Sequence, residues 1–142
     1  MLRHLFTLAA RLFPRIAGQV LSSNYIGLHG CLNTAMSFVT WNQVEGDYLE
    51  FGVWEGSSFA AAYHALQSNR QRHLAYGYDT PEYRRWKENP PRFFAFDSFE
   101  GIPGGEGERH VDYHEGAYQC SEERFRANLR SRRVDLSRVA TV

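Results

Sequence analysis

The sequence of 142 residues has only two cysteines, Cys31 and Cys120, and no net charge. Two cysteines are too few for a disulfide framework, and their spacing does not match a zinc site. We therefore expect a reducing, cytoplasmic compartment. The balance of 16 basic and 16 acidic residues argues against a general nucleic-acid-binding protein. No apolar run approaches the roughly 18 residues that span a bilayer, so we expect no membrane partner.

Acidic side chains are missing from residues 1–44, which carry three arginines. Such a composition is also found in transit peptides. Apolar residues at helical spacing predict a helix over residues 1–20, and a second helix is predicted from an N-cap at Asn33 to Trp41. We expect residues 1–45 to form a helical cap, with a membrane-surface helix as the alternative for the first 20 residues.

The residues that are present can build a core, because 43% are hydrophobic and 15% are aromatic. This composition excludes a disordered tail, a collagen-like repeat and a coiled coil. After residue 45, short apolar runs alternate with helix-forming segments. The predicted elements are strands at 48–53, 92–97 and 139–142, helices at 57–66 and 121–132, a polar surface excursion at 68–92 with some helix near 82–87, and a long loop at 101–120.

This order of elements predicts a doubly wound α/β fold with about three parallel strands and flanking helices. Residues 46–142 would then form the N-terminal half of such a domain. The last predicted strand has no helix after it, and an uncovered parallel edge is a liability. We therefore expect that the chain is the N-terminal part of a longer protein or packs against a partner, and a homo-oligomer stays open.

The segment from Glu50 to Ser58 combines a strand end, a bend and a helix start. Gly52 permits a sharp backbone turn, and Gly56 is expected to let the helix N-terminus approach a ligand closely. Ser57 and Ser58 are expected to cap that helix and to offer hydroxyl and N–H groups. Ligands of open α/β sheets bind beyond the carboxyl ends of the strands, where this segment is predicted to lie.

Two cofactor classes fit this bend to different degrees. A dinucleotide site has the pattern G-x-G-x-x-G, but here bulky residues separate Gly52 from Gly56 and the third glycine is missing. The carboxylates of Glu50 and Glu55 suit a positively charged ligand without phosphates. S-adenosylmethionine carries a sulfonium and an ammonium group, so the segment favours this cofactor over nicotinamide dinucleotides, which stay as an alternative.

A second acidic anchor, Asp97, follows the second predicted strand and is expected one strand away from Gly52. A carboxylate in that place can accept hydrogen bonds from both hydroxyls of an adenosine ribose. Asp79 is the rival, at a spacing nearer the roughly 20 residues of simple units. We favour Asp97 because the apolar run before it, Phe93–Phe96, is the better buried strand. A turn or helix cap is the alternative role for Asp97.

Two blocks of this sequence together resemble the TylF/MycF (macrocin) O-methyltransferase family. They are residues 46–58 (GDYLEFGVWEGSS) and residues 94–103 (FAFDSFEGIP), and a looser similarity covers roughly residues 33–142. The resemblance implies a Rossmann-like class I methyltransferase fold, S-adenosylmethionine as cofactor, and methylation of a hydroxyl on a sugar or other natural product. The implied cofactor-binding residues are Glu50, Gly52, Val53, Gly56, Ser57 and Ser58 around the methionine part, and Asp97 and Ser98 at the ribose.

The same resemblance places the metal-binding carboxylates and the base of the family beyond residue 142. We therefore assign no catalytic base and no metal ligand, and expect Mg²⁺ only in a full-length protein. The expected partner is a small-molecule acceptor. The functional alternative is a non-catalytic remnant or interaction module that retains half of the fold.

Two groups of charged residues are interpreted without a catalytic role. His110 and His114 lie in the glycine-rich loop at 101–120, where a solvated or substrate-lid role is favoured over a metal site. The arginines of the last predicted helix are expected to form a solvated face.

Overall fold

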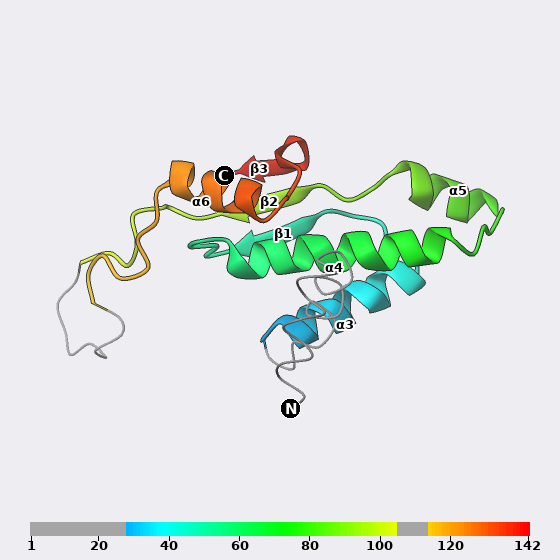
Figure 1. Ribbon diagram of the computed structural model, residues 1–142, viewed down its shortest axis with the longest axis horizontal. Helices are drawn as coiled ribbons and strands as arrows, with labels where there is room; N and C mark the ends of the chain where they lie inside the picture. Colours follow the sequence, from blue (N-terminus) through cyan, green and yellow to red (C-terminus); the bar gives the residue numbers. More distant parts are fainter. Residues whose placement is uncertain (1–27, 105–113) are drawn as a thin grey trace, which may run out of the picture.

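The structure is a computed structural model that describes residues 28–104 and 114–142. Its elements are α3 (Leu28–Trp41), β1 (Tyr48–Phe51), α4 (Ser57–Leu74), α5 (Pro81–Glu88), β2 (Phe93–Phe96), α6 (Glu122–Ser131), a 3-10 turn η1 (Leu136–Arg138) and β3 (Val139–Thr141). Figure 1 shows α4 running along the strands with α3 beside it. The helix predicted over residues 1–20 lies outside the described residues.

The three strands form one parallel sheet in the order β1-β2-β3. Tyr48 is in register with Phe93, and Phe93 is in register with Val139. Parallel neighbours need a crossover between them, and here each crossover contains a helix. The predicted α/β class with three parallel strands is therefore confirmed for the described residues, and it is compatible with part of a Rossmann-like fold.

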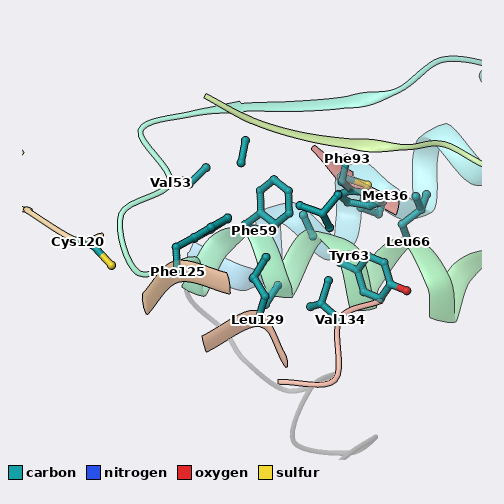
Figure 2. Packing of buried hydrophobic residues seen from close by; sticks show 14 residues of the cluster. Met36, Val53, Phe59, Tyr63, Leu66, Phe93, Cys120, Phe125, Leu129 and Val134 are labelled. Carbon is teal, nitrogen blue, oxygen red and sulfur yellow. The ribbon is translucent and has the colours of Figure 1, made fainter. Parts of the chain in front are cut away.

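Helices α4 and α6 pack on the same face of this sheet. Phe59 of α4 makes edge-to-face contacts with Phe93 of β2 and Phe125 of α6, with ring centroids 5.7 Å apart in both pairs. These three rings are fully buried, and Figure 2 shows Phe59 in the middle of the cluster. Aromatic pairs of this geometry contribute about 0.5–1.5 kcal/mol beyond their buried area, so they tie both helices to the strands.

The opposite face of the sheet is open to solvent in the described part of the chain. Side chains alternate along a strand, so Leu49 and Phe51 point away from α4 and are 51% and 74% exposed. Phe51 stacks on Phe96 of β2, with ring centroids 4.6 Å apart. The fold is thus a two-layer arrangement with one apolar sheet face uncovered.

Three sequence predictions need correction. The second helix, α3, begins at Leu28, so Asn33 lies inside it and is not its N-cap. Helix α4 does not end near residue 66 but continues to Leu74. The segment at 68–92 contains the predicted helix, α5, but it is not a surface excursion throughout, because Trp86 is only 2% exposed. Within residues 28–104 and 114–142, no helix is long and apolar enough to cross a bilayer.

Candidate functional site

The candidate site is the turn between β1 and α4, at the carboxyl edge of the sheet. Gly52 ends the strand pairing, because its N–H donates to the Phe96 carbonyl at 2.8 Å, and its φ of 76° needs the freedom of glycine. The chain turns again at Gly56, which is the N-cap of α4 with φ 78° and ψ 22°. The sharp bend predicted at Gly52 is therefore present.

Gly56 has a different role from the one predicted. A Cβ atom at this position would lie 2.8 Å from the Phe125 ring and 3.0 Å from Leu129, both on α6. The missing side chain thus admits α6 rather than a ligand. Ser57 and Ser58 do not cap α4, since Gly56 occupies the cap position and makes no side-chain cap hydrogen bond.

Glu50 joins β1 to the first turn of α4. Its carboxylate accepts hydrogen bonds from the Ser58 hydroxyl at 2.6 Å and from the Tyr48 hydroxyl at 2.5 Å. Burial, and then the hydrogen bond to Glu50, raise the pKa of Tyr48, so this phenol stays protonated as a donor. The Glu50 carboxylate is therefore held at the helix start in a fixed orientation.

Asp97 reaches the same turn from the neighbouring strand. It follows β2 directly, and one carboxylate oxygen, Oδ2, accepts a hydrogen bond from the Trp54 N–H at 2.9 Å. The other oxygen, Oδ1, accepts from the Phe99 N–H at 2.8 Å. Ser98 is exposed beside it, and its hydroxyl accepts from the Glu100 N–H at 3.3 Å. Asp97 thus has the turn-capping contacts given above as its alternative role, and both predicted anchors bind the segment from β1 to α4, Asp97 at Trp54 and Glu50 at Ser58.

Two residues considered in the sequence analysis, Val53 and Asp79, are not placed where they could line the site. Val53 is 2% exposed and belongs to the hydrophobic core, and its carbonyl accepts a hydrogen bond from the Gly56 N–H at 2.8 Å, so the predicted contact of Val53 with a ligand is not supported. The rival acid, Asp79, comes after the C-terminal end of α4, an 18-residue helix that is about 27 Å long. Asp79 pairs with exposed Arg84 at 3.3 Å, away from the turn that opens α4.

Backbone strain marks this edge of the sheet and was not predicted from the sequence. Trp54, Phe99 and Tyr118 have φ values of 45°, 60° and 62°, which residues other than glycine rarely adopt. The Asp97 carboxylate binds the N–H groups of the first two, and the Trp54 ring contacts the Tyr118 ring with centroids 5.3 Å apart. Strained residues that cluster in this way are typical of functional sites.

The arginines of the last predicted helix were expected to form a solvated face, but Arg124 of α6 contacts the turn and the C-cap residue Arg132 contacts the start of α4. Arg124 forms an ion pair with Glu55 at 2.8 Å, and Arg132 donates to the Ser57 hydroxyl at 3.1 Å. The Asn128 amide also donates to the Glu55 carbonyl at 3.1 Å. These contacts span about 70 positions of sequence, so no local pattern could predict them.

The described residues place no group of three or more His, Cys, Asp and Glu side chains where they could hold a metal ion. His110 lies outside the described part, whereas His114 is described and exposed. Comparisons of this chain with protein-family models, curated proteins and solved structures found no match.

Proposed function

We propose that this chain provides the cofactor-binding part of an S-adenosylmethionine-dependent O-methyltransferase with a class I, Rossmann-like fold of the TylF/MycF type. Its acceptor would be a hydroxyl of a sugar or another natural product. The observation that supports this best is the position of Asp97, whose carboxylate follows β2 and binds the turn that follows β1. Adenosine ribose hydroxyls are bound by an acid in this relation to the first strand in related α/β folds.

The carboxylate acceptors near the turn fit the cofactor chemically. Each carboxylate oxygen of Asp97 accepts one hydrogen bond from the backbone, and a carboxylate has about four acceptor sites, so capacity for the ribose hydroxyls is left. Glu50 supplies a negative charge for the ammonium or sulfonium group.

The bound cofactor would supply an electrophilic methyl group, and the residues of this chain would bind and orient it. Methyl transfer needs donor and acceptor held in line. We assign no catalytic base and no Mg²⁺ ligand to the described residues. The role proposed for these residues is therefore cofactor binding.

Isothermal titration of the chain with S-adenosylmethionine and with NAD tests this proposal. We expect binding of S-adenosylmethionine and no detectable binding of NAD, because the turn has two glycines and an acidic lining rather than a phosphate cradle. Binding of NAD alone, or of neither compound, would contradict the proposal.

One observation favours a second candidate, the non-catalytic interaction module. Leu49 and Phe51 form an exposed apolar face on the sheet, and such faces mark interaction sites. The same titration separates the two candidates, because an interaction module that lacks the cofactor site would give no heat with S-adenosylmethionine.

A further inference from the structure

A pocket of about 150 Å³ lies at the amino ends of the strands, whereas the turn between β1 and α4 lies at their carboxyl ends. Its lining comes from α3, α4, α5 and the segment that leads into β1, which starts at Tyr48. Apolar side chains form most of the wall, among them Met36, Val39 and Leu66. Figure 2 shows Met36 and Leu66 at the end of the core that lies away from Val53. A cavity of this size can hold a benzene-sized apolar group.

Two residues of this pocket carry buried polar atoms that have no hydrogen-bond partner among residues 28–104 and 114–142. Arg70 is only 5% exposed, and its Nη1 atom is unpaired. Its Nη2 atom donates to the carbonyls of Trp86 and Lys87, both at 3.3 Å, and the guanidinium lies 4.0 Å from the centre of the Trp86 ring. Thr40 is 1% exposed, and its hydroxyl is also unpaired. Buried polar groups without a partner are uncommon and need an explanation.

In the part of the chain that the structure describes, Arg70 has no carboxylate partner. The two acids in the lining are engaged with other arginines, because Glu45 pairs with Arg85 at 2.6 Å and Asp47 pairs with Arg92 at 3.2 Å. Burial, and then the positive charge of Arg138, lower the pKa of Arg70. Arg138 itself binds backbone carbonyls of the segment before β2. Arg70 is therefore a buried positive charge beside an apolar wall, and both acids of the lining are paired with other arginines.

We propose that this pocket binds a small amphipathic carboxylate, an aromatic or short aliphatic acid, whose carboxylate pairs with Arg70 and whose apolar part packs against Met36, Val39 and Leu66. Because Nη2 of Arg70 already donates to the Trp86 and Lys87 carbonyls, the carboxylate would accept its hydrogen bond from Nη1. Such charge-assisted bonds are about twice as strong as neutral ones. The Thr40 hydroxyl is a further donor in the lining. This site is separate from the proposed cofactor site, so either can fail without the other.

Titration of the whole chain with benzoate, followed by ¹H–¹³C methyl NMR, tests this proposal. We expect saturable shifts of the Met36 and Val39 methyl signals, with a dissociation constant of about 1 mM or lower. Benzamide has the same shape without the charge, and acetate has the charge without the ring. Both should bind at least about ten-fold more weakly, because each lacks one of the two contacts.

Two matched substitutions on α4 separate the pocket from general charge. Arg70→Met should weaken benzoate binding about ten-fold or more, whereas Arg72→Met, at an exposed position two residues further on, should leave it unchanged. Thr40→Val, which keeps the shape of the side chain, gives a second test if Arg70→Met does not fold, and should weaken binding a few-fold. Equal binding of benzoate and benzamide, or no shift of the pocket methyls with benzoate, would overturn the proposal.

Discussion

Asp97 is a side chain that can organise a turn and still bind a ligand. Its two oxygens each accept one backbone hydrogen bond, from Trp54 and from Phe99, and both of these residues have left-handed backbone angles. A strained conformation persists only where its surroundings stabilise it. The carboxylate therefore holds two strained residues at the edge where the cofactor is proposed to lie.

Replacement of this carboxylate should affect cofactor affinity specifically. We expect Asp97→Ala to weaken S-adenosylmethionine binding about ten-fold or more, the loss of one to two charge-assisted hydrogen bonds. Asp79→Ala is the matched control, because Asp79 is an exposed acid that pairs with Arg84 away from the turn. Calorimetry on both variants would check this prediction, with circular dichroism to confirm that they are folded. An unchanged affinity in Asp97→Ala would remove this residue from the site.

At the scale of elements, the turn between β1 and α4 depends on two glycines for different reasons. Their φ values are 76° and 78°, but their surroundings differ. Around Gly52 there is no atom within 4 Å of an added Cβ, whereas at Gly56 that atom would approach Phe125 to 2.8 Å. The first glycine therefore serves the backbone angle alone, and the second also serves the packing of α6.

This difference predicts unequal costs of the same substitution. Gly52→Ala should lower the free energy of unfolding by about 1 kcal/mol, the strain of a left-handed alanine. Gly56→Ala should lower it by about 2 kcal/mol or more, because overpacking against α6 adds to that strain. Urea unfolding followed by circular dichroism measures both values. Equal losses in the two variants would contradict the packing role of Gly56.

Most elements could be predicted from local patterns. The apolar run of Phe93–Phe96 is a short-range signal, and both this strand and the helix predicted at 121–132 form close to their predicted places. The bend at Gly52 and the arrival of Asp97 beside it follow from the parallel order of two consecutive strands. These features depend on residues that are neighbours along the chain or on adjacent strands.

The remaining features depend on distant partners and could not be predicted. Arg70 and Trp86 look like surface residues in a polar stretch, yet each buries the other through a contact between the guanidinium and the indole ring. Gly56 looks like a ligand-binding glycine until Phe125 of α6 is placed against it. Contacts between residues far apart in the sequence leave no local pattern. The burial of Arg70 and Trp86 and the packing of Gly56 could therefore not be predicted.

At the scale of the whole molecule, the described residues give the sheet one face covered by helices and one face without such a cover. Helices α4 and α6 bury Phe93 and Ala95, while Phe51 on the other face is 74% exposed. The two proposed binding sites lie at opposite ends of the strands. The turn with Asp97 is at the carboxyl ends of the strands, and the pocket with Arg70 is at their amino ends.

This separation makes the central claim testable in one experiment, a titration of the ¹⁵N-labelled chain with S-adenosylmethionine followed by ¹H–¹⁵N NMR. The account predicts saturable shifts of the amide signals of Gly52, Trp54 and Phe99, which surround the Asp97 carboxylate, and no shift of the amide signals of residues 66–70. If those three signals stay in place at saturating cofactor, or if the shifts fall instead on residues 66–70, the turn between β1 and α4 is not the cofactor site.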